Sequence, residues 1–370
     1  MAGTILITGG AGFIGSHLAD ELLAHGYSVR VLDNLTPQVH GDAGRPEYLD
    51  AQVELRVGDV RDPEAVARAL EGVDAVVHLA ARVGVGQSMY ELAGYTDVNS
   101  LGTAVLLEAL LDRPVARLLV ASSMSVYGEG LYRTAGGELV PGDERPREQL
   151  ERGEWELRGP DGLPLEPVPT PESKPPSLSS VYALTKYDQE RLCLLFGAAY
   201  GVPATALRFF NAYGPRQALS NPYTGVLAIF AARLLNKKPP LVYEDGNQRR
   251  DFVSVSDVAR ACRLALESKQ AAGEVLNVGS GRSASVLEVA RKLASVLGIE
   301  SEPELAGKSR TGDIRHCFAD ISRAGEVLGY EPQVTLEAGM AELAEWLEGQ
   351  AAVDRVDAAA EELSSRGLTI

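Results

Sequence analysis

The stretch T-G-G-A-G-F-I-G, Thr8 to Gly15, joins a predicted strand at Thr4–Thr8 to a predicted helix at Ile14–Ala24. Its glycines recur at every third position: Gly9, Gly12 and Gly15. Such a turn lets the backbone approach a pyrophosphate, because no Cβ blocks it, and the helix N-terminus then offers N–H groups to the anion. The alternative is a strand-to-helix turn that is tight for packing reasons alone. The stretch therefore predicts a dinucleotide site at the first βα turn.

Short apolar runs alternate with helical patterns through residues 1–130. The strands predicted after the first are Val29–Leu32, Val53–Val57, Ala75–Leu79 and Arg117–Ser122, with helices at Pro63–Leu70 and Thr103–Leu111 among those between them. Apolar strands separated by helices are typical of a parallel sheet that is covered on both faces. The predicted fold class is α/β, a Rossmann-type doubly wound parallel sheet with a smaller C-terminal α/β substrate-binding domain.

A carboxylate after the second predicted strand indicates which dinucleotide the turn binds. Asp33 lies about 20 residues beyond the glycines, where it can accept hydrogen bonds from the adenosine ribose and would repel a 2′-phosphate. We therefore expect NAD rather than NADP. Arg30 weakens this preference slightly, although it lies inside the strand. Asp59, after the third strand, either receives the adenine amino group or serves as a helix N-cap.

Composition narrows the class of protein further. The chain has 370 residues, 45% hydrophobic content and a formal net charge of −16, which favours a large globular core and opposes general nucleic-acid binding. No window holds eighteen uninterrupted apolar residues, and Met1 leads directly into a strand pattern, so we expect a cytoplasmic protein without membrane insertion. The cysteines lie far apart and predict no metal site: Cys193, Cys262 and Cys317.

The chain divides into three predicted parts: an NAD-binding domain at 1–210, a second domain at 211–350 that would bind the substrate, and a helical tail at 351–370, with its helix at Ala351–Arg366. The pattern near 250–267 allows a return of the second part to the first. Within the first domain, an insertion at about 131–178 is rich in proline, glycine and charge, and we expect it to be only partly ordered. Loops of this length are usually functional or flexible.

A tyrosine and a lysine lie four residues apart in V-Y-A-L-T-K, Val181 to Lys186, on one face of a helix predicted at 181–200. An ordinary amphipathic surface pair is the alternative. A phenol of pKa ~10 is a poor base at neutral pH. An ammonium about 5 Å away favours the phenolate by about 3 kcal/mol at an effective dielectric of about 20, and a positive nicotinamide adds to this. Tyr182 is therefore the predicted general base, with Lys186 lowering its pKa.

Seven motifs occur in the order seen in extended short-chain dehydrogenases/reductases. They are T-G-G-A-G-F-I-G, H-L-A-A (His78–Ala81), S-S-M-S-V-Y-G (Ser122–Gly128), Y-A-L-T-K (Tyr182–Lys186), L-R-F-F-N (Leu207–Asn211), Q-R-R-D-F-V-S-V-S-D-V-A (Gln248–Ala259) and R-T-G-D-I-R (Arg310–Arg315). The chain most resembles the nucleotide-sugar epimerase/dehydratase branch of that family, over about residues 3–345 apart from the insertion. The resemblance implies an NAD-dependent isomerase that acts on a nucleotide sugar.

The resemblance also implies roles for individual residues. Ser123 would hydrogen-bond the sugar hydroxyl that is oxidised, Tyr182 would remove its proton, and Lys186 would hold the nicotinamide ribose. The implied cofactor contacts are Gly9, Gly12, Phe13, Ile14, Gly15, Asp33, Asn34, Asp59, Val60, Leu79, Ala80, Ala81, Asn99, Tyr182, Lys186 and Phe209. The implied substrate contacts are Val83, Ser123, Ser125, Asn211, Val226, Arg250 and Arg310. Guanidinium forks suit phosphate oxygens, although a surface ion pair is the alternative for both arginines.

The two residues after Ser123 limit the reaction. In the 4,6-dehydratases of this branch these positions carry Asp and Glu, the acid and base of the elimination, whereas here they are Met124 and Ser125. Neither side chain can transfer that proton, so we expect 4-epimerisation by oxidation and re-reduction at C4, with NAD regenerated in each turnover. The alternatives are a 2-epimerase, a 4-keto reductase, a 4,6-dehydratase and a non-catalytic NAD-binding module.

Further stretches resemble bacterial dTDP-L-rhamnose 4-epimerases: R-V-G-V-G after H-L-A-A, N-P-Y-T-G-V at Asn221–Val226, and E-E-L-x-x-R-G-L near the C-terminus. They imply a dTDP-6-deoxyhexose substrate, with UDP-glucose/galactose and UDP-glucuronate as alternatives. Val83 stands where galactose-type epimerases tend to carry a lysine. The resemblance also implies a homodimer through the helices at Thr103–Leu111 and Tyr182–Tyr200. The insertion is expected to be a lid or a dimer-contact arm, with a solvated excursion as the alternative.

Overall fold

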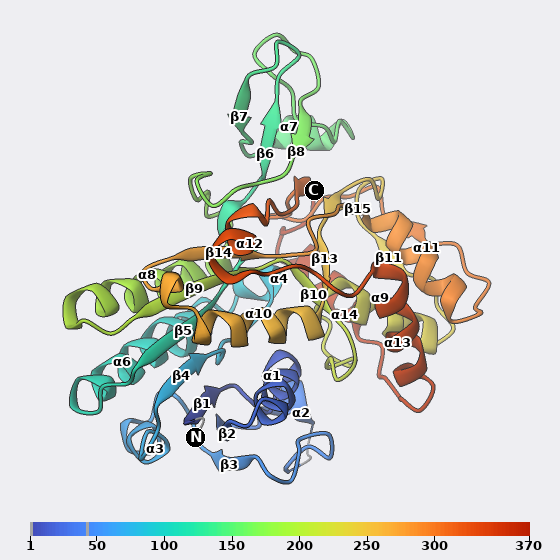
Figure 1. Ribbon diagram of the computed structural model, residues 1–370. Helices are drawn as coiled ribbons and strands as arrows, with labels where there is room; N and C mark the ends of the chain where they lie inside the picture. The colour runs from blue at the N-terminus through green and yellow to red at the C-terminus, as the bar shows by residue number, and fades with distance from the viewer. Residues whose placement is uncertain (1–2, 42–43) are drawn as a thin grey trace.

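The computed structural model describes residues 3–41 and 44–370. Within them, seven strands form one parallel sheet in the order β14-β9-β5-β4-β1-β2-β3 (Figure 1). Their bounds are β1 (Thr4–Thr8), β2 (Ser28–Asp33), β3 (Glu54–Val57), β4 (Ala75–His78), β5 (Arg117–Ser123), β9 (Ala204–Phe209) and β14 (Val275–Val278). The strand order reverses between β1 and β4, and ligands of such sheets bind at the carboxyl ends of the strands near this point.

Helices cover both faces of the sheet. One face carries α1 (Phe13–Ala24), α10 (Val255–Glu267) and α12 (Ser322–Leu328), and the other carries α3 (Pro63–Ala69), α6 (Gly102–Asp112) and α8 (Val181–Tyr200). Ile5 and Ile7 of β1 belong to the first apolar layer, whereas Leu6 between them belongs to the second. Alternate side chains of a strand point to opposite faces, so a fully apolar strand needs helices on both. The predicted doubly wound α/β fold is confirmed.

A third apolar cluster lies outside the two layers of the large sheet. It is enclosed mainly by α9 (Val226–Leu235), α11 (Val286–Val296) and α13 (Leu336–Leu347). Short sheets adjoin it: β10 (Asn211–Tyr213) with β13 (Phe252–Ser254), β11 (Leu241–Val242) with β16 (Glu304–Leu305), and β12 (Arg249–Arg250) between β15 (Ala284–Ser285) and β17 (His316–Cys317). The chain then contributes α10 and β14 to the layers of the large sheet. The domain boundary at residue 210 stays a prediction.

Short helical turns connect these elements. They are α2 (Pro37–His40), α4 (Val85–Ser88), α5 (Leu92–Tyr95), the π-helical turn η1 (Thr96–Leu101), and the 3₁₀ turns η2 (Met124–Tyr127) and η3 (Lys269–Ala271). Four of them, α4, α5, η1 and η2, lie beside α8. They therefore surround the helix that carries the predicted catalytic tyrosine and lysine.

The insertion is better ordered than its composition suggests. It contains β6 (Leu131–Arg133), β7 (Leu139–Pro141), α7 (Arg147–Glu151) and β8 (Glu166–Val168). The three strands form an antiparallel sheet that projects from the rest of the molecule (Figure 1). At its base, the buried Tyr132 hydroxyl donates a hydrogen bond of 2.7 Å to Glu129. Backbone pairing and buried polar contacts thus order a segment with few apolar residues.

The tail helix is shorter than predicted. α14 spans Val356–Ser365, whereas the sequence pattern suggested a start at Ala351. The Asp354 side chain accepts a hydrogen bond from the Val356 N–H at 3.0 Å and pairs with Lys238 at 3.0 Å. These contacts hold the chain in a non-helical conformation before the helix begins, so the prediction for residues 351–355 is wrong.

Two further properties concern residues 3–41 and 44–370 only. No helix among them is long and apolar enough to cross a membrane. They also contain no group of three or more His, Cys, Asp or Glu side chains placed to hold a metal ion.

Candidate active site

The glycine turn between β1 and α1 has the geometry that a dinucleotide needs. Gly9 has φ +70°, and a Cβ on it would lie 2.9 Å from the Ala80 Cα. A Cβ on Gly15 would lie 2.5 Å from the Gly10 Cα, so this glycine lets α1 pack closely on the turn. Gly12 is the N-cap of α1, and no side chain of the described residues caps the helix there. The first N–H groups of α1 are thus available to an anion.

Asp33 ends β2 and lies at the edge of this turn. Its carboxylate accepts hydrogen bonds from the backbone N–H groups of Ala11 and Leu35, both at 3.0 Å. These contacts fix the carboxylate beside the glycine turn, where a ribose would lie. Arg30 faces elsewhere, because its guanidinium donates to Glu54 at 2.7 Å and to the Ala69 carbonyl at 2.9 Å. Arg30 therefore offers no binding group to a 2′-phosphate.

Replacing Asp33 with asparagine should reduce the discrimination between NAD and NADP. The substitution removes the negative charge that would repel a 2′-phosphate, so the ratio of the NADP to the NAD dissociation constant should fall roughly tenfold, about 1.4 kcal/mol. Equilibrium binding of both dinucleotides to cofactor-stripped protein measures this ratio, with Asp50→Asn at an exposed position as the control. An unchanged ratio would show that Asp33 does not face the adenosine ribose.

Asp59, after β3, is held by neighbouring side chains. Arg61 donates to it at 2.7 Å, and the Asn34 amide donates at 2.9 Å. The hydrogen bonds from Arg61 hold the Asp59 pKa well below its usual range, so the side chain is a carboxylate at neutral pH. The N-cap of α3 is Asp62, which accepts from the Glu64 N–H, and not Asp59. The N-cap alternative for Asp59 is therefore wrong, and its role as an acceptor for the adenine stays a prediction.

The other predicted cofactor residues gather at the same edge of the sheet or pack behind it. Asn99 is fully buried; its amide oxygen accepts from the Arg82 N–H at 2.7 Å, and its amide nitrogen donates to Thr185 Oγ1 on α8 at 3.0 Å. It therefore joins the segment Leu79–Arg82 after β4 to the catalytic helix. Val60 is 6% exposed and belongs to the apolar layer under α3 and α6. Phe13 and Ile14 begin α1.

The three predicted catalytic residues come together at the carboxyl end of β5. Ser123 is the last residue of β5, and its hydroxyl oxygen accepts a hydrogen bond from the Ser125 N–H at 3.1 Å. Tyr182 and Lys186 lie in the first two turns of α8, which Ser180 caps through the Ala183 N–H at 3.1 Å. Helix α8 packs against β5 and β9. All three catalytic side chains are buried.

Burial and the hydrogen bond with Ser123 shift the pKa of Tyr182. Burial raises the pKa of Tyr182 above its usual value, and hydrogen bonding with Ser123 lowers it. Lys186 was expected to lower this pKa through its charge, and in the structure its ammonium donates to Gln189 Oε1 at 2.6 Å. The effect of Lys186 on the Tyr182 pKa stays a prediction. Burial also lowers the pKa of Lys186 to about 8, so its side chain is still mostly charged at neutral pH.

A buried polar network lies behind Lys186. Gln189 is fully buried, and its amide nitrogen donates to Thr103 Oγ1 at 2.9 Å and to the Ala80 carbonyl at 3.3 Å. His78 Nδ1 contacts Thr8 Oγ1 at 2.7 Å, and burial lowers the His78 pKa to about 3, so the imidazole is neutral. The sequence prediction missed Gln189. Its position three residues after Lys186 on one helix was the available signal.

Phe209 and the pair after Ser123 lie beside the carboxyl end of β5, and the turn η2 that holds the pair packs against α8. Phe209 ends β9 directly beside Ser123 of β5 in the sheet register. Met124 is 7% exposed and packs into an apolar cluster that contains Phe210. The buried Ser125 hydroxyl contacts the Met124 sulfur at 3.9 Å. Met124 and Ser125 thus lie next to the predicted substrate hydroxyl, and neither carries a group that can exchange a proton near neutral pH.

The predicted substrate residues form a second group. Asn211 begins β10, and its buried amide oxygen has no hydrogen-bond partner among the described residues. Val226 begins α9, whose N-cap is Gly225, close to the Ala212 carbonyl. The unpaired Asn211 acceptor fits a ligand group that donates a hydrogen bond, and the α9 N-terminus, which no side chain of the described residues caps, fits an anionic oxygen. Val83 lies in the loop after β4 and is 51% exposed.

The two predicted phosphate-binding arginines meet at one loop. Arg250 donates from β12 to the backbone carbonyls of Ile314 and Arg315, the latter at 3.0 Å. Arg310 pairs with Asp313 at 2.9 Å and lies 4.3 Å from the centre of the Tyr243 ring. The surface ion pair that was the alternative for Arg310 is thus present within its own loop. Arg250 instead supports that loop through its backbone.

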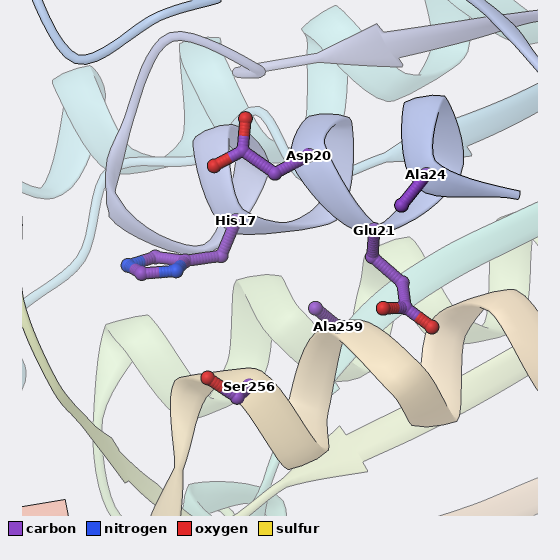
Figure 2. Close-up of a pocket in the computed structure, with 6 residues that line it drawn as sticks. All are labelled: His17, Asp20, Glu21, Ala24, Ser256 and Ala259. Carbon is purple, nitrogen blue, oxygen red and sulfur yellow. The ribbon is translucent and has the colours of Figure 1, made fainter.

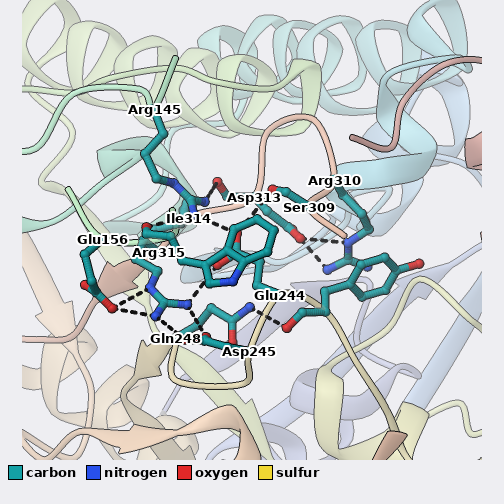
Figure 3. Close-up of polar contacts among 12 residues, drawn as sticks. Arg145, Glu156, Glu244, Asp245, Gln248, Ser309, Arg310, Asp313, Ile314 and Arg315 are labelled. Atoms are coloured by element: carbon teal, nitrogen blue, oxygen red, sulfur yellow. Dashed lines mark hydrogen bonds and ion pairs between the residues drawn. The ribbon is translucent and has the colours of Figure 1, made fainter. Parts of the chain in front are cut away.

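The same loop is tied to the insertion by a buried charge cluster (Figure 3). Arg315 is fully buried and pairs with Glu244 at 2.9 Å, with Asp245 at 2.6 Å and, through its Nε, with Glu156 of the insertion at 3.1 Å. Arg145 of the insertion also reaches Glu244, at 2.7 Å. Removing one partner of a buried ion pair is strongly destabilising. The insertion is therefore fixed to the segment that carries Arg310.

A groove of about 270 Å³ lies elsewhere, between α1 and α10 (Figure 2). It is lined by His17, Asp20, Glu21, Ala24, Ser256 and Ala259. The His17 Nε2 contacts the Pro215 carbonyl at 3.1 Å, and burial lowers the His17 pKa to about 4. None of the predicted catalytic, cofactor or substrate residues lines this groove, so we assign it no part in the chemistry.

Known proteins of one family resemble this chain over most of its length. The sequence matches the NAD dependent epimerase/dehydratase family over residues 5–149 and 159–279. The chain belongs to this family. It is 40% identical to a dTDP-L-rhamnose 4-epimerase of Burkholderia thailandensis, over 93% of the chain and 94% of that protein. The predicted family and the predicted cofactor, NAD, are thereby confirmed, as is the prediction of an enzyme of the epimerase class.

Two solved structures are similar over almost the whole chain. A UDP-glucose 4-epimerase of Thermotoga maritima with UDP-glucose is 33% identical, with a TM-score of 0.76 and coverage of 93% of this chain and 98% of that one. A UDP-glucose 4-epimerase of Thermus thermophilus in complex with NAD is 32% identical, with a TM-score of 0.74 and coverage of 94% and 100%. The glycine turn and Asp33 fit NAD, because a Cβ at Gly9 or Gly15 would collide with backbone and the fixed carboxylate suits a ribose.

Proposed function

We propose that this protein is an NAD-dependent nucleotide-sugar 4-epimerase and that its substrate is a dTDP-6-deoxyhexose such as dTDP-L-rhamnose. The observation that carries the proposal is the position of Met124 and Ser125 directly beside Ser123, Tyr182 and Lys186. The site has the groups to remove and restore a proton on one sugar oxygen. It has no carboxylate at the two positions where a dehydratase would need its acid and base.

The proposed reaction uses Ser123 and Tyr182 on the same 4′-hydroxyl. Ser123 hydrogen-bonds this hydroxyl, and the Tyr182 phenolate accepts its proton while the hydrogen on C4 leaves as hydride and C4 becomes a carbonyl. Bound NAD supplies the hydride acceptor and later the hydride donor. The 4-keto sugar then turns over while Arg310, on the loop that Arg250 supports, holds the diphosphate. The hydride returns to the other face of C4, and Tyr182 returns the proton to the oxygen.

The second part of the proposal concerns the nucleotide base and the sugar of the substrate. The relative from Burkholderia thailandensis, which carries the name dTDP-L-rhamnose 4-epimerase, supports a deoxythymidine nucleotide and a 6-deoxy sugar. Val83, half exposed at the end of the loop after β4, offers an apolar surface to that sugar. UDP-glucose and UDP-glucuronate are the competing substrates. A cytoplasmic location, as predicted from the sequence, fits a nucleotide-sugar substrate.

We also propose a homodimer through α6 and α8. Both helices carry exposed apolar side chains on their outer surfaces: Leu111, Leu184, Leu195 and Tyr200, which are 48–62% exposed. Burying such residues on association removes apolar area from water. A second copy that presents the same two helices would cover them symmetrically.

Ser123→Ala should move the pH dependence of turnover as well as its size. Because hydrogen bonding with Ser123 lowers the pKa of Tyr182, its loss raises that pKa, and the fraction of phenolate falls at any given pH. We expect kcat at pH 7 to fall roughly 10²-fold and the acidic limb of the kcat profile to move to higher pH. A lower kcat with an unshifted limb would show that Ser123 does not act on the Tyr182 titration.

The decisive test of the proposed function is product analysis with a panel of nucleotide sugars. Protein is incubated with dTDP-, UDP-, GDP- and CDP-sugars, and the products are identified by NMR. We expect a mixture of C4 epimers from a dTDP-6-deoxyhexose and slower or no conversion of the UDP-sugars. Release of a 4-keto-6-deoxy sugar from an NDP-hexose would show that the protein is a dehydratase and not an epimerase. NAD binding without conversion of any sugar would support the non-catalytic module instead.

A further inference from the structure

The C-terminal segment, residues 363–370, pairs with the loop that carries Arg310. Ile370 N–H donates to the Ser309 carbonyl at 2.8 Å, and Ser309 N–H donates back to the Ile370 carbonyl at 3.0 Å. Thr311 N–H donates to the Leu368 carbonyl at 2.9 Å. Arg310 itself forms an antiparallel bridge with Thr369. Backbone pairing on both sides of Arg310 restricts the positions that its guanidinium can reach.

The segment is anchored at its other end near the loop after β4. Leu363 of α14 is 4% exposed and packs on Gly86 of α4, where a Cβ would lie 3.3 Å from the Leu363 Cδ1. The Arg366 guanidinium lies 4.4 Å from the centre of the Tyr90 ring. The Tyr90 hydroxyl shares a hydrogen bond of 2.6 Å with the Tyr223 hydroxyl. The segment therefore spans from α4 to the Arg310 loop.

The segment joins α4 to the Arg310 loop, and both of these lie against the start of α8. A Cβ on Gly312 of the Arg310 loop would lie 3.0 Å from the Ser179 carbonyl and 3.5 Å from Val85 Cγ1 of α4. Ser88 at the end of α4 accepts a hydrogen bond from the Tyr182 N–H at 2.9 Å. The C-terminal segment is thus linked to the substrate side of the site by α4 and by the Arg310 loop. None of its described hydrogen bonds reaches the residues of the glycine turn.

The Arg310 loop is also held from its opposite end. Arg315 is fixed by Glu156, Glu244 and Asp245, while Asp313 orients the Arg310 guanidinium (Figure 3). Arg315 is buried and paired with three carboxylates. These ion pairs do not hold the stretch 309–312, and this is the part of the loop with which the C-terminal segment pairs. Removal of the segment would release the Arg310 side of the loop but leave the Arg315 side in place.

We propose that residues 363–370 position the Arg310 loop for the diphosphate of the nucleotide sugar and so set the affinity for substrate. The inference rests on the proposed function, since it assigns Arg310 to the substrate. The segment touches neither the reacting carbon nor the catalytic tyrosine. Its loss therefore weakens binding of the nucleoside diphosphate part, in the ground state and in the transition state alike, and raises KM without lowering kcat.

The test compares full-length protein with two variants of the segment. Deletion of residues 368–370 removes the three backbone hydrogen bonds, and Ile370→Pro removes only the N–H that donates to Ser309. We expect the deletion to raise KM, and the dissociation constant of dTDP, by tenfold or more, with kcat within about twofold and NAD content unchanged. Ile370→Pro should raise both constants severalfold. Glu361→Ala, exposed on α14 outside the segment, is the control and should leave them unchanged.

Limited trypsin digestion gives a readout that is independent of turnover. Cleavage at Arg366 requires the segment to leave its site, so saturating dTDP should slow this cleavage severalfold in the full-length protein. A KM and a dTDP affinity within twofold of wild type in the deletion variant would overturn the proposal. A fall in kcat at unchanged KM would also overturn it.

The outcomes separate this proposal from the proposed function. If full-length protein bound dTDP but converted no nucleotide sugar, the epimerase assignment would fail, while the affinity difference of the deletion variant would still decide the role of the segment. If it bound neither dTDP nor UDP, both proposals would fail together. If it epimerised its substrate and the deletion had no effect, only the positioning role would be lost.

Discussion

Tyr182→Phe protein should convert its nucleotide sugar roughly 10²–10⁴-fold more slowly than wild type while it keeps its bound NAD. The substitution removes only the hydroxyl that exchanges the substrate proton. The ring keeps its edge-to-face packing on Tyr95, at 6.5 Å between ring centres, and the Tyr182 N–H still donates to Ser88. Folding and cofactor binding should therefore survive.

The measurement for Tyr182→Phe is kcat together with the NAD released on denaturation per protein chain. Tyr27→Phe is the matched control, because Tyr27 donates to Glu267 at the far end of α1 and not at the site. Near wild-type turnover of Tyr182→Phe would refute the base assignment. Loss of NAD with loss of turnover would mean that the hydroxyl holds the cofactor, and would leave the base unassigned.

Lys186→Met should abolish both turnover and cofactor retention. The ammonium is buried and donates to Gln189, which in turn contacts Thr103 and the Ala80 carbonyl beside Gly9. Methionine fills a similar volume but leaves the Gln189 oxygen without its donor, and it offers no hydrogen bond to a nicotinamide ribose. We expect kcat to fall by at least 10²-fold and the NAD content of purified protein to fall to a small fraction of one per chain.

Measurements of kcat and of the NAD content per chain decide the role of Lys186, with Lys269→Met at an exposed position as the control. Full NAD content with low turnover would limit Lys186 to the chemistry at the sugar. Wild-type turnover would contradict its assignment altogether. Thermal unfolding distinguishes either result from a loss of folding, because the unpaired Gln189 oxygen should lower the melting temperature by a few degrees and leave the protein folded.

Much of the fold follows from local patterns. The strand-turn-helix around Gly9 and the strand at Ala204–Phe209 form as predicted, because continuous apolar runs and glycine positions determine them. β14 was missed, because Val275–Val278 is only four residues long and pairs with a strand that lies far away in sequence. The order within the insertion was also underestimated, since it depends on backbone pairing and on charges that only the tertiary structure brings together.

The three proposed catalytic residues could be picked out from the sequence because each lies in a short motif, whereas most of their supporting contacts could not. The order of the motifs points to Ser123, Tyr182 and Lys186. The contact of Lys186 with Gln189 is local, and their spacing on one helix was a signal that the prediction did not use. Arg250 with the Arg315 carbonyl and Arg310 with Thr369, by contrast, join residues that are far apart in sequence, so no local pattern specifies their pairing.

In the proposed reaction, hydride leaves C4 of the sugar and returns to the same carbon within one turnover. The sharpest measurement uses a nucleotide sugar that carries deuterium at C4, incubated with the enzyme in ordinary water and analysed by NMR and mass spectrometry. Both epimers at equilibrium should retain the deuterium at C4, and no 4-keto-6-deoxy product should form. Loss of the label to solvent, or its appearance at C6, would contradict this reaction.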